Sequence, residues 1–189
     1  SDVCSSDLWG LIDRFSEDID LVVDKDTLGF AGDASPEQAP SNKQLQRRLH
    51  DLMAACRAWV QDRLRPALEA AMIERFGSND SWKLEVDPDM ADGQCLLLHY
   101  PGAFPSDEAG YVRPVVKIEL GARSDDWPAD SRTITPYVAE VLPLAIPNAA
   151  FTVPSLAPTR TFWEKAMLLH EESFRPADKP RKERSEEHT

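Results

Sequence analysis

Two short stretches in which charged and apolar residues alternate constrain the fold of this chain most strongly. They lie at residues 18–23 and 115–120, and their charged members are Asp18, Asp20, Lys117 and Glu119. A period of two places successive side chains on opposite faces of a β-strand. We therefore expect two strands of a half-buried sheet, each with one charged face and one apolar face.

A long helical region separates these two stretches. Apolar residues recur at helical spacing from Leu45 to Trp59, and Ser41 is placed to cap the start of the helix. Pro66 interrupts the pattern and is expected to start a second helix, which ends at Gly77. Residues 82–86 and 95–100 are then predicted to be strands.

A further helix is predicted near the end of the chain, over residues 161–172. Thr161 and Glu164 have the spacing of a capping box, and Phe162, Ala166 and Leu169 would form its core-facing stripe. The whole pattern predicts an α+β fold in which a mixed β-sheet is packed by helices around residues 42–76 and 161–172.

Composition limits the classes of function. The formal net charge of −12 argues against a generally basic nucleic-acid-binding surface, although RNA could still be held in a local basic groove. The sequence has no apolar run long enough to span a membrane, so we expect no membrane partner. Cys56 and Cys95 lack a CxxC spacing, which predicts reduced thiols and a cytoplasmic location.

The two ends of the sequence are related through DNA. One codon choice for the opening peptide Ser1–Leu8 has a reverse complement that encodes Arg184–Thr189, the closing peptide. We therefore expect residues 1–8 and 184–189 to be translated adapter sequence around a fragment of a longer gene. This leaves a partial domain over residues 9–174 and a polar linker over 175–183.

The pair Asp18 and Asp20 has the spacing of a metal site. Two carboxylates on one strand face repel each other unless a cation lies between them, and hard oxygen ligands suit Mg²⁺, which also takes phosphate oxygens. Glu119 would add a third carboxylate from a second strand and complete a two-metal site, with Lys117 facing phosphate charge. The alternative is that both pairs are simply the solvated face of a half-buried sheet.

Basic residues at the start of the last predicted helix could meet an anion. Arg160 lies where the helix dipole favours negative charge, and Lys165 follows one turn later, within reach of a triphosphate. The alternative is that both are solvated surface residues.

Three segments in this order resemble the AbiEii-type nucleotidyltransferase toxins, within the polymerase-beta-like nucleotidyltransferase superfamily. They are Arg14-Phe15-Ser16-Glu17-Asp18-Ile19-Asp20-Leu21, Val116-Lys117-Ile118-Glu119-Leu120-Gly121-Ala122-Arg123 and Arg160-Thr161-Phe162-Trp163-Glu164-Lys165-Ala166. The family forms the toxin half of bacterial toxin–antitoxin and abortive-infection systems, and some members modify tRNA.

The resemblance implies roles for individual residues. Asp18 and Asp20 would be the metal acids. Glu119 and Lys165 would join them in the catalytic site. Candidates for contacting the nucleotide are Ser16, Lys117, Arg160 and Lys165. The family also has a Gly-Gly-Ser/Thr segment before the position of Trp9 and an Asp-containing helix after Lys165, and this sequence contains neither, so we expect the fragment to be inactive.

The expected function is therefore transfer of a nucleotidyl group from a nucleoside triphosphate to an acceptor such as tRNA, with two Mg²⁺ ions and with a possible cognate antitoxin. Two alternatives stay open. One is a metal-dependent glycosyltransferase that uses Asp-x-Asp, and the other is a non-catalytic pseudo-enzyme or antitoxin-binding module.

Overall fold

The structure is a computed structural model that describes residues 2–3, 18–78, 80–90, 92–102, 113–136, 138–139, 142, 144 and 149–176. Ser16 lies outside these residues, as do the segments 177–183 and 184–189. Within the described residues, no helix is both long and apolar enough to cross a membrane.

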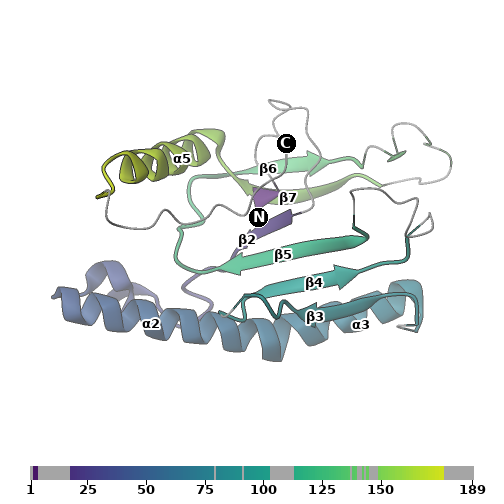
Figure 1. Ribbon diagram of the computed structural model, residues 1–189, viewed down its shortest axis with the longest axis horizontal. Helices are drawn as coiled ribbons and strands as arrows, with labels where there is room; N and C mark the ends of the chain where they lie inside the picture. Colours follow the sequence, from purple (N-terminus) through teal and green to yellow (C-terminus); the bar gives the residue numbers. More distant parts are fainter. Residues whose placement is uncertain are drawn as a thin grey trace.

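A five-stranded mixed sheet forms the centre of the fold (Figure 1). Its order is β1 (Asp2–Val3), β2 (Asp18–Val22), β5 (Val115–Gly121), β4 (Cys95–His99) and β3 (Lys83–Val86). The pair β2 and β5 is parallel, and the other neighbours are antiparallel. The predicted α+β class with a mixed sheet is confirmed. The short strand β1 falls within residues 1–8, which we did not expect to take part in the fold.

The sheet has one apolar face and one charged face, as the alternation predicted. Ile118 and Leu120 are buried, whereas Asp18 and Asp20 are exposed. On β4 the pattern continues, since Leu96 lies opposite Ile118 and is fully buried. The apolar face therefore belongs to the core, and the charged face is available for chemistry.

A continuous helical rod covers the apolar face. It consists of α2 (Asn42–Trp59), the π-helical turn η3 (Val60–Leu64) and α3 (Arg65–Phe76), and it runs along one side of the sheet in Figure 1. The Ser41 hydroxyl accepts a hydrogen bond from the Gln44 N–H at 3.3 Å, so the predicted cap is confirmed. Leu52, Cys56 and Val60 have no exposed surface and pack into the core.

The predicted second helix, α3, is present with Pro66 in its first turn and Gly77 at its end, but no loop separates it from α2. A proline removes one helical hydrogen bond and crowds the carbonyl one turn earlier. The wider π turn immediately before α3 accommodates the proline near the start of that helix, so the rod continues without a loop. The rod ends at Gly77, whose φ of 82° is the left-handed conformation that glycine adopts without strain.

Smaller elements complete the described chain. Two short 3₁₀ turns, η1 (Gly32–Ala34) and η2 (Pro36–Gln38), lie between β2 and α2. The strands β6 (Ala129–Ile134) and β7 (Phe151–Leu156) form a separate antiparallel pair. The helix α5 (Pro158–Ser173) follows β7 and lies across the molecule from α2 and α3 in Figure 1.

Two expectations for α5 are wrong. The helix begins at Pro158, three residues before the predicted start, because proline is favoured in the first helical turn; Thr161 is therefore inside the helix and does not cap it. The two large residues of the predicted core stripe are also exposed, Phe162 at 63% and Leu169 at 66%. Thr161 is the buried residue of this helix, so α5 is anchored to the described chain at its first turn.

Candidate active site

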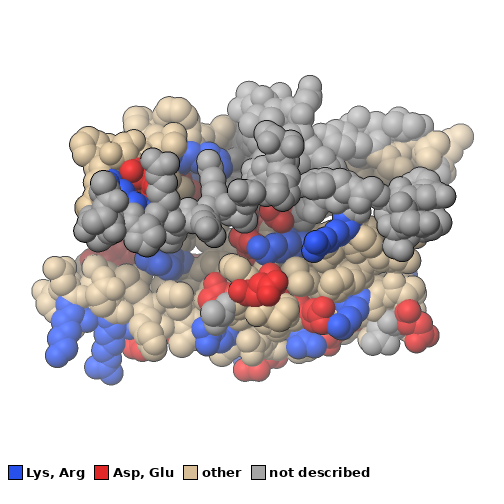
Figure 2. Space-filling model, in the orientation of Figure 1, with Lys and Arg blue, Asp and Glu red and all other residues tan. Residues whose placement is uncertain are grey.

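A cleft of about 420 Å³ opens where β2 and β5 meet the start of α5. Its polar walls include Asp20, Asp92, Gln94, Glu119, Arg123 and Glu164. Figure 2 shows acidic and basic side chains gathered next to one another near the centre of one face of the molecule. The cleft therefore combines residues from both alternating stretches with residues that sequence reasoning had not selected.

Strand register brings the predicted acids to one face. Asp20 lies opposite Glu119, and Asp18 lies opposite Lys117. Paired residues on neighbouring strands project on the same side of a sheet. Asp18, Asp20, Lys117 and Glu119 therefore form two rows of charge on adjacent strands, the arrangement expected from their spacing.

Lys117 and Glu119 are paired along their own strand. The Lys117 Nζ lies 2.5 Å from Glu119 Oε1. The hydrogen bond with Glu119 raises the pKa of Lys117, burial opposes this, and the charges of Glu119 and Asp18 add to the rise. Lys117 therefore stays protonated. Its charge can balance part of the negative charge of Glu119 on its own strand and of Asp18 on the neighbouring strand.

The turn between β3 and β4 forms a second wall of the cleft and is held by the helical rod. Arg57 Nε donates to the Asp92 carbonyl, and Gln61 Nε2 donates to the Gly93 carbonyl at 3.4 Å. A Cβ at Gly93 would lie 2.9 Å from Gln61 Nε2, and the φ of Gly93 is 65°. The positive φ therefore favours glycine in this turn, which positions Asp92 and Gln94 at the cleft.

Gln94 is a cleft residue that sequence reasoning missed. It is 5% exposed, and its Nε2 has no hydrogen-bond partner among the described residues. Its backbone carbonyl accepts from the Leu120 N–H at 3.0 Å, which fixes it beside β5. No pattern in the sequence distinguishes this glutamine from a surface residue.

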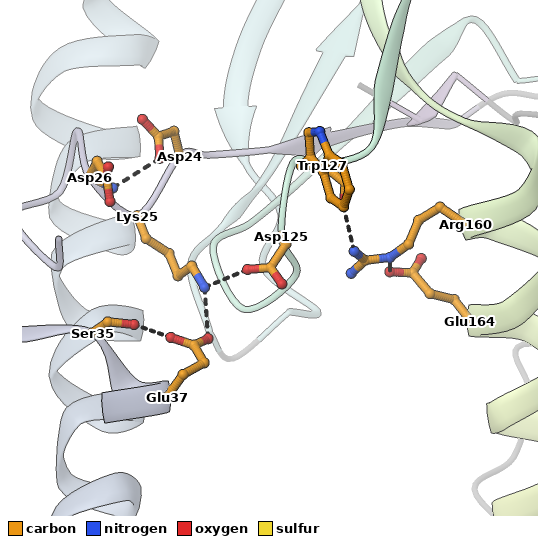
Figure 3. Close-up of polar contacts among 9 residues, drawn as sticks. All are labelled: Asp24, Lys25, Asp26, Ser35, Glu37, Asp125, Trp127, Arg160 and Glu164. Carbon is orange, nitrogen blue, oxygen red and sulfur yellow. Dashed lines mark hydrogen bonds and ion pairs between the residues drawn. The ribbon is translucent and has the colours of Figure 1, made fainter. Parts of the chain in front are cut away.

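The first turns of α5 form a third wall. Arg160 Nε donates to Glu164 Oε1 at 2.7 Å, and Arg160 Nη1 donates to the Trp127 carbonyl at 2.7 Å (Figure 3). The residue of this helix that lines the cleft is Glu164, whereas Lys165 is exposed. Arg160 thus already has two partners, and a role for Arg160 or Lys165 in contacting the nucleotide stays a prediction.

A largely buried lysine holds the loop that follows β5. Lys25 Nζ lies 2.7 Å from Glu37 Oε1 and 2.6 Å from Asp125 Oδ1, and its side chain is only 15% exposed (Figure 3). Hydrogen bonds from Lys25 and then Ser35 lower the pKa of Glu37 to about 2. Sequence analysis did not select these residues, because Lys25 and Asp125 are 100 positions apart.

The acids fit Mg²⁺ by their chemistry. Magnesium is commonly bound through one or two carboxylates together with water and substrate phosphates. Within the part of the chain that the structure describes, no three His, Cys, Asp or Glu side chains gather to hold a metal by themselves. A metal ion at this cleft would therefore need ligands besides the described side chains.

An α+β core that presents carboxylates from two adjacent strands to one cleft fits the nucleotidyltransferase class. The model of the family described as nucleotidyl transferase AbiEii toxin, type IV toxin–antitoxin system, matches residues 7–185. Because this match spans nearly the whole sequence, the chain belongs to the AbiEii family of nucleotidyl transferase toxins. Neither the curated proteins nor the solved structures yielded a match. A system of this type pairs its toxin with a cognate antitoxin.

Proposed function

We propose that this protein transfers a nucleotidyl group from a nucleoside triphosphate to the hydroxyl of an acceptor such as tRNA. Asp18, Asp20 and Glu119 would hold the Mg²⁺ ions that the reaction needs, with the remaining ligands supplied by phosphate oxygens of the substrate and by water. The observation that carries the proposal is the register pairing of Asp20 with Glu119 at the wall of the cleft.

The proposed reaction is an in-line displacement. The acceptor oxygen forms a bond to the α-phosphorus, and the bond from that phosphorus to the oxygen bridging to the β-phosphate breaks. Pyrophosphate leaves with the electron pair of the broken bond. We assign the hydroxyl proton to the Glu119 carboxylate because it lies on the cleft wall opposite Asp20. Mg²⁺ held by Asp18, Asp20 and Glu119 would compensate charge on the phosphates and would favour loss of the proton from the attacking hydroxyl.

The charge of the cleft supports a requirement for a divalent cation. Among the described cleft residues, Asp20, Asp92, Glu119 and Glu164 carry carboxylates and Arg123 carries a guanidinium. A bare triphosphate would be repelled by this excess of negative charge. We propose that the ammonium groups of Lys117 and Lys165 contact the phosphates and supply further positive charge. The hydroxyl of Ser16 would donate a hydrogen bond to the same phosphates.

Arg160 fits a positioning role better than direct contact with phosphate. Its guanidinium bridges Glu164 on the cleft wall and the Trp127 carbonyl on the loop after β5. Both partners would have to be exchanged for phosphate oxygens if Arg160 were to bind the nucleotide directly. We also propose a cytoplasmic location, supported by the free, buried thiols of Cys56 and Cys95.

The experiment that tests the proposal is transfer of label from NTPs. The chain, and beside it a version that also carries the family's Gly-Gly-Ser/Thr segment before Trp9 and its Asp-containing helix after α5, is incubated with Mg²⁺, total tRNA and ATP, GTP, CTP or UTP labelled at the α-phosphate. We expect labelled tRNA from at least one donor with the extended version, and a loss of about 10²-fold or more when Asp20→Asn is made in it. The extended version serves as the wild type for all variants below. Asp51→Asn is the matched control, because it removes an exposed carboxylate on α2.

The possible outcomes separate the proposed function from its alternatives. A glycosyltransferase would transfer label from a sugar nucleotide and not from an NTP. A non-catalytic module would transfer label from neither donor. Equal labelling by Asp20→Asn and the wild type would contradict the assignment of the site.

A further inference from the structure

The loop between β5 and β6, which contributes to the wall of the cleft, exposes a large aromatic ring. Trp127 is 76% exposed. In the same loop, Arg123 and Ser124 line the cleft that contains Asp20 and Glu119. A ligand that covers this indole would gain the free energy of its burial.

The loop that carries Trp127 is held from two sides. Its Asp125 carboxylate pairs with the largely buried Lys25, and its Trp127 carbonyl accepts from Arg160. Figure 3 shows Trp127 between the Lys25–Asp125 contact and the Arg160–Glu164 pair. The backbone that carries the exposed indole is therefore anchored on both sides. Because the loop is already ordered, a ligand that binds against the indole pays a smaller entropic cost.

A short chain of contacts connects the backbone of Trp127 to the cleft. Glu164 lines the cleft and pairs with Arg160, and Arg160 in turn holds the carbonyl of Trp127. A ligand that spans both places needs an anionic end, which a cation can bridge to the carboxylates, and a flat aromatic end for the indole. A nucleoside triphosphate has both ends in one molecule.

We propose that Trp127 is the stacking surface for the base of the donor nucleotide, with the triphosphate directed to the acids at the ends of β2 and β5. This inference rests on the proposed function and adds a binding residue to it. Stacking on an aromatic ring tolerates different bases, because every base has a π-face. Trp127 therefore contributes affinity for the nucleotide and leaves the choice of base to other groups.

The test is a comparison of ligands by isothermal titration calorimetry with Mg²⁺ present. Wild-type protein, Trp127→Ala, Trp127→Phe and Trp163→Ala are titrated with the NTP that the wild type binds most tightly, and separately with inorganic tripolyphosphate. Trp163 is the matched control, because it is a tryptophan that is 65% exposed on α5. Because the Trp127 ring is exposed and the bond from Arg160 goes to a backbone carbonyl, Trp127→Ala should keep the wild-type Tm.

We expect Trp127→Ala to raise the Kd for the NTP by about 5-fold to 100-fold and to leave the Kd for tripolyphosphate unchanged. Trp127→Phe should retain most of the affinity, and Trp163→Ala should bind both ligands like the wild type. Equal NTP affinity in the wild type and Trp127→Ala would overturn this inference and leave the proposed function standing.

Two other outcomes would also overturn the inference. A wild type that binds no NTP would remove both the inference and the proposed function. If Trp127→Ala weakened binding of tRNA while NTP binding stayed unchanged, the ring would belong to the acceptor and not to the donor nucleotide.

Discussion

Asp20 of β2 and Glu119 of β5 lie opposite each other on adjacent parallel strands, and both line the same cleft. Asp18 and Lys117 form the preceding pair in this register. A shift of one residue in the pairing would move one member of each pair to the apolar face. The register of two strands thus decides whether these charges can act together.

The carboxylate of Glu119 is predicted to be essential for transfer. Glu119→Gln keeps the size of the side chain but removes its charge, so we expect kcat to fall by about 10²-fold to 10³-fold. Glu85→Gln is the matched control, because Glu85 projects from the same charged face on the edge strand β3. An equal fall in kcat in the two variants would show that activity depends on the total charge of this sheet face, and not on the position of Glu119.

Lys165 is predicted to contact the triphosphate although it is exposed on α5. Lys165→Ala should abolish nucleotidyl transfer and leave the Tm unchanged, since an exposed lysine contributes little to folding. Lys43→Ala removes an exposed lysine from α2 and should behave like the wild type. Full activity in Lys165→Ala would exclude the residue from the site.

Arg160 is predicted to act through Trp127 and Glu164. Arg160→Gln should raise the KM for NTP more than it lowers kcat, because the nucleotide-stacking ring loses its anchor. In a Trp127→Ala background the same change should add little to KM, since the two residues act as a unit. Additive effects of the two changes on KM would argue that Arg160 contacts the nucleotide independently.

Acid should weaken the contact between Lys25 and Glu37. The pKa of Glu37 falls from 4.5 to about 2 in the folded chain, chiefly through the hydrogen bond from Lys25. A carboxylate with a lowered pKa stabilises the fold fully above pH 4.5, and this contribution disappears as the pH falls towards 2.

Urea unfolding at several pH values measures this effect. Glu37→Gln should be less stable than the wild type at pH 7 by about 1 kcal/mol or less, because Glu37 is half exposed and solvent screens the pair. The difference should shrink between pH 4.5 and 2. A difference that stays constant across this window would mean that the charge of Glu37 does not stabilise the fold.

Gly93 is predicted to be required for the turn that carries Asp92 and Gln94. Its φ of 65° disfavours any side chain, and an added Cβ would lie 2.9 Å from Gln61 Nε2. Gly93→Ala should lower the free energy of unfolding by about 1–2 kcal/mol. Gly121→Ala is the control for stability, because a Cβ there meets no atom within 4 Å. Equal stability of the two variants would contradict the requirement for glycine.

The sequence by itself determined which side chains share a face. Asp18 with Asp20, and Lys117 with Glu119, could be assigned to charged faces because strand periodicity is a local property of the chain. The cap at Ser41 and the helix end at Gly77 were predictable for the same reason, since each depends on a few neighbouring residues. The resemblance carried by three short motifs also identified the family that the comparison confirms.

Only the tertiary structure decided which of these local features meet. The parallel pairing of β2 with β5, the contact of Lys25 with Asp125 and the position of Trp127 beside Arg160 all join segments that are far apart in the chain. Periodicity reports the face of a strand but not its neighbour or its register. The apolar stripe on α5 is a second example. Helical spacing predicts which side of a helix is apolar, but it does not predict whether another part of the chain covers that side. Strand partners and burial depend on how the whole chain packs, and this is why the walls of the cleft could not be predicted from local patterns.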